Sequence, residues 1–196
     1  MAMLQPFTTA SPIQANFSFE DVSSGIGFLK YYGFNTYVVG DTRAYQLSPN
    51  TVYSYDISTG NTDANAKTFN FDTSVFTLPR TAKGTAIVNA CVAVSASLNS
   101  TVKFEIFKVT GVTETSICSS VTWTATAATK NYSICIPLTL TQTVFASGDF
   151  IRLKLIVDSD SSTANALTLY HDPKNRGALT DVMSELSLNM PFAIEY

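Results

Sequence analysis

Residues 186–196 alternate between apolar and mostly polar side chains, one residue at a time. Side chains on a β-strand point to opposite faces in turn, so a strand here has one apolar face and one largely polar face. We therefore expect the C-terminal segment to be held in a sheet. The apolar positions are Leu186, Leu188, Met190, Phe192, Ile194 and Tyr196.

The same two-residue period recurs along most of the chain and predicts roughly nine to eleven strands. Helical segments that could serve as crossovers are almost absent, so the strands should pair mostly antiparallel. The expected fold class is all-β, an antiparallel β-sandwich of jelly-roll type. Residues 1–14 are expected to form an extended N-terminal arm, and residues 15–196 a single domain.

Local patterns assign several of these elements. An aromatic-rich strand is expected over Phe28–Val39, with further strands at Tyr45–Leu47 and Val52–Ile57. The segment Ser58–Ala66 is rich in turn-forming residues and predicts a loop. Residues Leu179–Leu186 carry apolar side chains at helical spacing, so a short helix competes there with the strand.

The composition narrows the possible partners. Only 14% of the residues are charged, against about 25% in an average soluble domain. The chain instead contains 26 Thr and 21 Ser, and the net charge is −3. The basic residues form no cluster that could neutralise successive phosphates, so we expect no nucleic-acid partner.

A membrane partner is not expected either. No run approaches the roughly 18 apolar residues that would cross a bilayer. The first residues lack the basic start and apolar core of a signal peptide.

Few residues are candidates for catalysis. His171 is the single histidine and so the one ordinary general base near neutral pH. A Ser–His–carboxylate triad would use it, but no G-x-S-x-G motif supports that arrangement. A loop-edge histidine with a local hydrogen bond is the alternative. A glycosidase would need two opposed carboxylates, and no pair stands out among Glu20, Glu105, Glu114, Glu185 and Glu195.

Metal and disulfide sites find equally little support. Asp158 and Asp160 have the spacing of successive calcium ligands, yet the glycine and later glutamate of an EF-hand are missing. Cys91, Cys118 and Cys135 form no C-x-x-C pair, so small buried side chains in a reducing compartment are the simplest interpretation. The sequence therefore predicts no catalytic residues, no metal site and no cofactor.

Aromatic residues are concentrated between residues 28 and 37. They could form a platform for sugar rings, since aromatic faces offer a large contact area at low entropic cost. They could equally pack in the core or at a subunit interface. The residues are Phe28, Tyr31, Tyr32, Phe34 and Tyr37.

Two segments suggest a family. The stretches Phe19–Gly33 (FEDVSSGIGFLKYYG) and Phe71–Ala86 (FDTSVFTLPRTAKGTA) resemble capsid auxiliary proteins of tailed bacteriophages, the decoration or cement proteins, and related small all-β proteins of marine viral genomes. The resemblance implies a jelly-roll fold, assembly as a homotrimer and attachment to the major capsid protein. It also implies a location on the capsid surface of the virion, after synthesis in the host cytoplasm.

The function expected from this resemblance is non-enzymatic: a viral structural protein that binds and stabilises the head lattice. Contacts with the capsid or with sister subunits are assigned to the arm, in particular to Pro6, Phe7, Pro12 and Ile13. The alternative is a carbohydrate- or receptor-binding β-sandwich module of a phage tail or fibre, which would present an exposed aromatic groove. A hydrolase, the third class, would depend on His171.

Overall fold

The computed structural model describes residues 26–38, 42–60, 66–95, 100–159, 167–177 and 183–193. These residues contain twelve strands and no helix, and hence no helix that could cross a membrane. The strands are β1 (Ile26–Val38), β2 (Thr42–Ser48), β3 (Ser58–Gly60), β4 (Lys67–Thr73), β5 (Arg80–Val94), β6 (Thr101–Thr110), β7 (Thr113–Ser116), β8 (Val121–Thr124), β9 (Lys130–Phe145), β10 (Phe150–Asp158), β11 (Leu167–Tyr170) and β12 (Ser187–Ala193).

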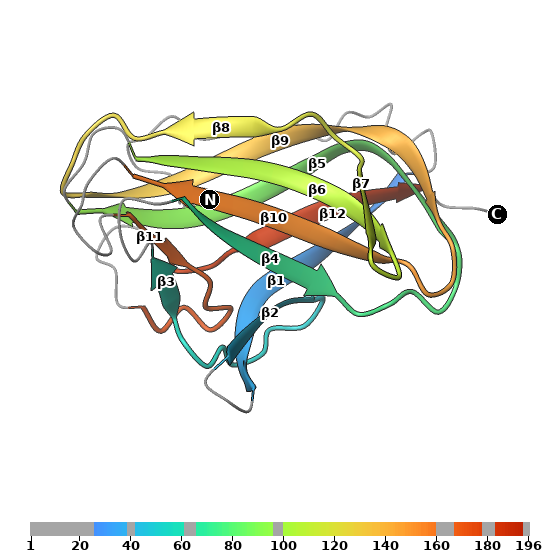
Figure 1. Ribbon diagram of the computed structural model, residues 1–196, viewed down its shortest axis with the longest axis horizontal. Coiled ribbons are helices and arrows are strands. Elements are labelled where there is room, and N and C mark those ends of the chain that lie inside the picture. The colour runs from blue at the N-terminus through green and yellow to red at the C-terminus, as the bar shows by residue number, and fades with distance from the viewer. Residues whose placement is uncertain are drawn as a thin grey trace, which may run out of the picture.

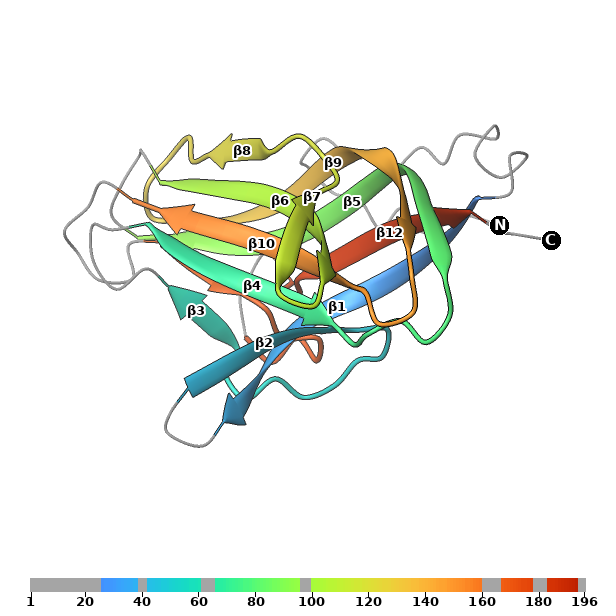
Figure 2. The same ribbon diagram turned by 45° about the vertical axis from the view of Figure 1, so that its right-hand side comes forward.

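The strands form two layers (Figures 1 and 2). One layer has the order β3-β11-β5-β12-β1-β2, and the long strand β9 also pairs with β5. The other layer has the order β4-β10-β6-β7, with β8 beside β6. Every strand pair is antiparallel except β2–β4, which joins the two layers. The all-β sandwich expected from the sequence is confirmed.

Strand β10 illustrates why these sequences form sandwich strands. Its apolar residues Ile151, Leu153, Leu155 and Val157 are all fully buried, while the residues between them are only partly buried. Each such side chain contributes about 1.5–3 kcal/mol when it leaves water. The alternation therefore fixes which face of β10 points into the core.

The C-terminal segment lies in the middle of its layer. Strand β12 pairs with β1 on one side and with β5 on the other. Leu188 and Met190 are fully buried, as is Leu186 just before the strand. The apolar face expected there is confirmed up to Ala193, and residues 194–196 lie outside the described residues.

Three local expectations are wrong within the described residues. Residues Val52–Ile57 form an irregular loop, because the Ser54 hydroxyl and the Asp56 backbone N–H both donate to Asn35 Oδ1 and no strand ladder forms there. Residues Ser58–Gly60, expected as loop, form β3 because they pair with β11. Of the possible helix Leu179–Leu186, residues 183–186 are not helical, since the Leu186 carbonyl accepts a hydrogen bond from Gly33 and its side chain is buried, and residues 179–182 lie outside the described residues.

The junction between β2 and β4 positions the site described below. Their parallel pairing covers only Gln46 with Asp72 and Leu47 with Thr73. Strand β2 is otherwise held by β1 over seven residue pairs, and β4 by β10 over six. The two strands therefore belong to different layers and touch only near their ends.

Candidate ligand-binding site

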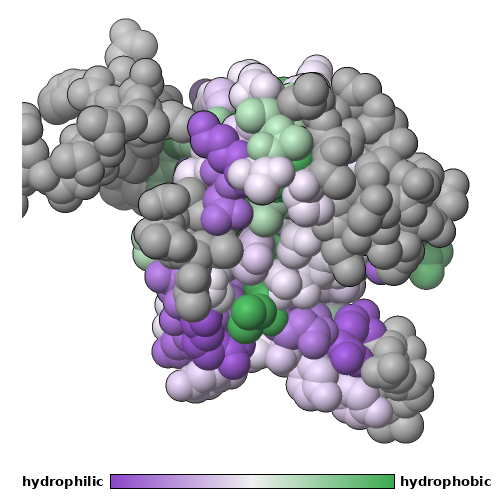
Figure 3. Space-filling view, turned by 90° about the vertical axis from the view of Figure 1, so that its left-hand side faces the viewer, coloured by the Kyte–Doolittle hydropathy of each residue, from purple (hydrophilic) through white to green (hydrophobic). Residues whose placement is uncertain are grey.

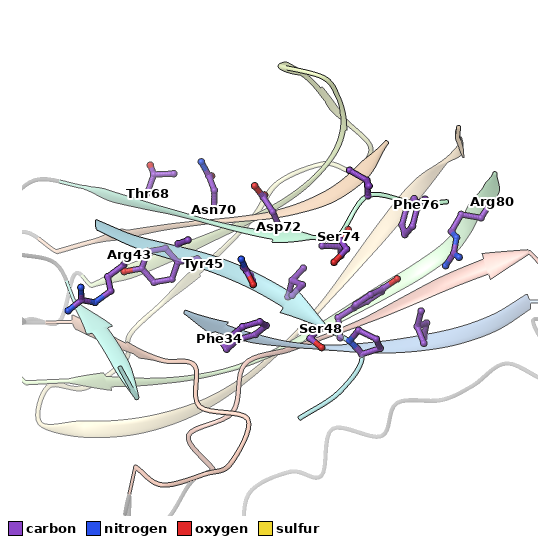
Figure 4. A pocket seen from close by; sticks show the side chains of 18 residues that line it. Phe34, Arg43, Tyr45, Ser48, Thr68, Asn70, Asp72, Ser74, Phe76 and Arg80 are labelled. Carbon is purple, nitrogen blue, oxygen red and sulfur yellow. The ribbon is translucent and has the colours of Figure 1, made fainter. Parts of the chain in front are cut away.

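An open cleft of about 900 Å³ follows the junction between β2 and β4 (Figure 4). Its walls come from β1, β2, β4 and the segment that leads into β5. The volume lies within the range of about 300–1,000 Å³ that is typical of small-molecule sites. The cleft exists because the two layers separate where the short β2–β4 pairing ends.

Aromatic side chains supply much of the cleft lining. Figure 4 places Arg43 and Tyr45 at one end and Phe76 and Arg80 at the other, with Phe34 on the β1 side. The Tyr45 ring packs against Phe69 and Phe71, with centroid distances of 5.3 and 5.1 Å. These core contacts hold the ring rigidly, so a ligand would meet a preformed wall.

Two charged residues of the lining are neutralised by partners. Arg43 Nε donates to Asp56 Oδ2 at 2.6 Å. Burial acts to raise the pKa of Asp56, but hydrogen bonds from Arg43 and Asn35 outweigh it and hold the pKa below its ordinary value. Asp72 receives two hydrogen bonds from Arg152, at 2.7 and 2.6 Å. Because Arg43 and Asp72 are each paired with an opposite charge, neither adds much net charge to the cleft.

Two polar groups of the lining lack a hydrogen-bond partner among the described residues. They are Asn70 Oδ1 on β4 and Arg80 Nε at the start of β5, both buried. Four buried side-chain atoms of the described residues are in this state, so half of them belong to the cleft. Unpartnered buried polar atoms are costly and are concentrated where a ligand or solvent completes the structure.

An exposed aromatic surface adjoins the Arg43 end of the cleft. We call it the tyrosine surface; it consists of Tyr37, Tyr53 and Tyr55, whose exposed fractions are 52%, 70% and 59%. The Arg43 guanidinium lies 4.6 Å from the Tyr55 ring centroid and 5.5 Å from that of Tyr37. Arg43 therefore links the cleft wall to the tyrosine surface.

Basic side chains also border Tyr53. The guanidinium of Arg176 lies 5.1 Å and Lys174 Nζ 5.7 Å from its ring centroid. Arg176 is itself paired with Asp172. The tyrosine surface is thus aromatic, with cations held at its edges.

His171 lies in the core beneath this loop and does not line the cleft. Its side chain is fully buried, with Nδ1 3.3 Å from Ser54 Oγ and the ring edge-on to Tyr45. Burial lowers the pKa of His171 to about 4. The histidine and the serine are 117 residues apart in the sequence and form a buried structural pair, so the loop-edge histidine with a local hydrogen bond that the sequence suggested is wrong.

The remaining sequence candidates are dispersed. Glu105 pairs with Lys103, Glu185 with Lys30, and Glu114 with both Arg152 and Lys154. Glu20 and Glu195 lie outside the described residues. None of the described glutamates therefore faces a second carboxylate across a cleft.

Metal ligands are not gathered either. The described residues contain no group of three or more His, Cys, Asp or Glu side chains that could hold a metal ion. Asp158 is exposed, and Asp160 lies outside the described residues. All three cysteines are free; only Cys91 is fully buried, and burial raises its pKa to about 12.

The arm and its candidate contact residues cannot be compared with the structure. Residues 1–14, with Pro6, Phe7, Pro12 and Ile13, lie outside the described residues. Of the aromatic set, Tyr31 and Phe34 are buried, Phe28 and Tyr32 are partly buried, and Tyr37 is exposed.

Several site residues escaped the sequence reasoning. The sequence pattern predicts a strand at Tyr53 and Tyr55, and it predicts no site at Asn70 or Arg80. The alternation of Tyr53, Tyr55 and Ile57 imitates a strand, so the pattern misleads there. No local sequence pattern predicts that Asn70 or Arg80 belongs to a site, because the cleft brings together segments far apart in the chain.

Comparisons with known proteins add a likeness of fold. No protein-family model matches the sequence, and no curated protein does. Among solved structures, a CocE/NonD family hydrolase from Staphylococcus aureus matches with a TM-score of 0.50 and 10% identity, over 86% of this chain and 37% of that one. An α-amino acid ester hydrolase (14% identity) and an aminopeptidase from a marine sediment Thaumarchaeota archaeon (12% identity) each match with a TM-score of 0.46, over 64% of this chain and 25% of theirs.

These comparisons correct one expectation. The sequence predicted that the chain is not an enzyme, and this is contradicted because the solved structure that shares its fold at a TM-score of 0.50 is a hydrolase. The chain spans about a quarter to two fifths of the length of the hydrolases named above. At 10% identity the likeness concerns the fold and assigns no reaction to this chain.

Proposed function

We propose that this chain is a binding domain that recognises an oligosaccharide in the cleft between β2 and β4 and on the adjoining tyrosine surface. The observation that carries the proposal is the continuity of the two features through Arg43, which lines the cleft and contacts the rings of Tyr37 and Tyr55. A ligand longer than the cleft could therefore extend over exposed aromatic rings.

The chemistry of the lining suits a sugar. Sugar rings present C–H groups that pack on aromatic faces and hydroxyls that need both donors and acceptors. The cleft offers Tyr45 and Phe34 for packing and amide or hydroxyl groups for hydrogen bonding. The polar residues of the lining that carry no formal charge are Gln46, Ser48, Thr68, Asn70, Thr73 and Ser74.

Asn70 offers a test that separates binding from folding. Its Oδ1 atom has no partner in the protein, so replacing Asn70 with Ala removes no internal hydrogen bond through that atom. We expect the wild-type protein to bind members of an oligosaccharide array, and Asn70→Ala to weaken that binding about tenfold while the unfolding midpoint stays within experimental error.

Asn131→Ala is the matched control, because Asn131 lies on β9 and is not part of the cleft lining. Its binding should equal that of the wild type in isothermal titration calorimetry. Absence of binding to every oligosaccharide on the array, or equal affinities for the two variants, would contradict the proposed function.

A capsid decoration role is the second candidate. One specific observation favours it: the sandwich ends in exposed apolar side chains on the β4–β5, β6–β7 and β9–β10 side. We call this the apolar tip; it consists of Val75, Leu78, Val112 and Val144, with exposed fractions of 56%, 69%, 99% and 58%. By contrast, hydrophilic and near-neutral residues dominate the described surface at the other end (Figure 3).

In this second role the apolar tip would rest on the major capsid protein, and the chain would act as a homotrimer on the head. Apolar patches rimmed by polar residues are frequent sites of protein contact. Quantitative mass spectrometry of virions that encode this chain is the test. Many copies per head are expected, with loss of those copies in a Leu78→Glu/Val112→Glu variant that folds normally. Virions without the chain would rule this candidate out.

A further inference from the structure

We infer that the cleft selects oligosaccharides that carry a carboxylate, and that Arg80 binds this group. The inference rests on the proposed function, because it names the class of sugar that the same cleft would take. It starts from the charges of the cleft lining.

Arg80 is the cation of the lining that no carboxylate of the described residues neutralises. The lining contains three charged residues, Arg43, Asp72 and Arg80. Asp56 neutralises Arg43, and Arg152 neutralises Asp72. Arg80 forms no ion pair with any described residue. The cleft therefore carries one uncompensated positive charge at its Arg80 end.

The surroundings of Arg80 are apolar and hold its guanidinium in place. The group lies 4.4 Å from the ring centroid of Phe76 and 5.2 Å from that of Phe192. Aromatic rings attract a guanidinium and fix its position. A cation that is only partly solvated and has no counterion favours the entry of an anion.

The donors of Arg80 are divided between the protein and the cleft. Nε is buried and has no partner, while the side chain as a whole is half-buried and lines the cleft. Tyr31 is a neighbour: burial raises the pKa of its hydroxyl, and a hydrogen bond with Arg80 opposes that rise. Because Nε has no partner, a terminal N–H of Arg80 makes the contact with Tyr31, and the remaining terminal N–H groups are the donors that we assign to the ligand.

A carboxylate fits these donors better than a phosphate monoester of higher charge. The unbalanced charge of the cleft is a single positive charge, and Asp72 is a further member of the lining. A guanidinium offers coplanar N–H groups that match the two oxygens of a carboxylate. A uronic acid or a sialic acid supplies this group on a sugar ring.

The test compares acidic probes with neutral counterparts. Trigalacturonate and its fully methyl-esterified form make one pair, and sialyllactose and lactose make another that differs by the whole acidic sugar. Calorimetry should give at least tenfold tighter binding of one acid than of its neutral counterpart. Arg80→Gln should remove this preference, so that the acid and its neutral counterpart bind the variant with similar affinity.

Lys83→Gln is the matched control, because Lys83 lies on the same strand, is exposed and is absent from the cleft lining. It removes the same charge and should keep the full preference. Arg80→Lys, which keeps the charge but loses the planar N–H array, should keep only part of it. Circular dichroism and thermal unfolding of each variant establish that it is folded.

The outcomes separate the two proposals. Equal binding of acid and neutral probes in both pairs, or equal effects of Arg80→Gln and Lys83→Gln, would overturn the carboxylate inference and leave the oligosaccharide proposal standing. If none of the four probes binds while other array members do, the carboxylate inference is overturned in the same way. Absence of binding to any oligosaccharide overturns both.

Discussion

Asn35 and Ser54 hold each other across a gap of 19 residues in the sequence: the Asn35 backbone N–H donates to Ser54 Oγ at 2.9 Å, and Ser54 Oγ donates to Asn35 Oδ1 at 2.9 Å. Both residues are buried. Ser54 lies between Tyr53 and Tyr55 in the chain, so its inward anchoring leaves its two neighbours exposed. The exposure of Tyr53 and Tyr55 on the tyrosine surface is therefore a consequence of this reciprocal contact.

Replacing Ser54 with Ala should destabilise the protein. The change leaves the buried backbone N–H of Asn35 without its partner, which costs about 1–3 kcal/mol, while Asn35 Oδ1 keeps the hydrogen bond from the Asp56 backbone N–H. Equilibrium unfolding in urea measures the loss. Ser48→Ala is the comparison, since Ser48 Oγ accepts one exposed hydrogen bond from Asn50 and should cost less than about 0.5 kcal/mol. Equal costs for the two variants would show that the Asn35–Ser54 contact does not support the loop.

The tyrosine surface should contribute affinity without contributing stability. The Tyr55 ring is 59% exposed, and an aromatic contact is worth about 0.5–1.5 kcal/mol beyond the area it buries. Tyr55→Ala should therefore weaken oligosaccharide binding about three- to tenfold, with the thermal midpoint nearly unchanged. Val112→Ala, at the apolar tip, is the control and should bind as the wild type does. If Tyr55→Ala binds the oligosaccharide with unchanged affinity, the tyrosine surface is not part of the binding site.

The single histidine predicts a pH dependence of stability. Burial lowers the pKa of His171 to about 4 in the folded protein, whereas an unfolded chain binds the same proton below about pH 6.5. Between these values the unfolded state holds more protons. The free energy of unfolding is therefore highest above pH 6.5 and falls by about 3 kcal/mol as the pH drops to 4.

His171→Gln isolates this contribution, because glutamine does not titrate. Urea unfolding at pH 7 and at pH 4.5 should show a smaller decrease for the variant than for the wild type. Carboxylates with lowered pKa values, such as Asp56 and Asp149, lose their contributions at still lower pH in both proteins. The same decrease in both proteins would mean that His171 is not buried in its neutral form.

Gly33 should tolerate no side chain. A Cβ atom there would lie 2.6 Å from Leu186 Cδ2 and 2.9 Å from its Cγ, and Leu186 is fully buried. Overpacking of this kind costs about 1–3 kcal/mol, so Gly33→Ala should lower the free energy of unfolding by that amount. In a double-mutant cycle with Leu186→Ala, the combined loss should be smaller than the sum of the two single losses. Strict additivity would contradict this close contact.

The β-strands could be predicted from the sequence wherever one face of a strand is buried. Phe28–Val39 and the alternating segment from Leu186 onward were found because one set of alternate side chains enters the core. The same reasoning gave a wrong strand at Tyr53 and Tyr55. These residues lie in a loop, and they are exposed because the side chain of Ser54 between them is anchored inward. Ser58–Gly60 was missed because its strand state depends on pairing with β11, far away in the chain.

The candidate site could not be predicted from local patterns. Asn70 and Arg80 lie on different strands, and what distinguishes them is a missing partner, a property that only the folded arrangement defines. The aromatic platform was placed on Phe28–Tyr37, but the exposed rings come from Tyr37 together with the later loop. The sole histidine was a candidate because of its chemistry alone, but it is buried in the core and does not line the cleft.

The central claim is that the cleft between β2 and β4 binds an oligosaccharide. Chemical-shift mapping by NMR tests it most directly, with isotope-labelled protein titrated against the tightest-binding member of the array. We expect the perturbed amides to cluster at residues 43–48 and 70–76, with further changes at Tyr53 and Tyr55. Perturbations confined to Leu78, Val112 and Val144 of the apolar tip or to the outer strands β7 and β8, with the cleft amides unmoved, would contradict it.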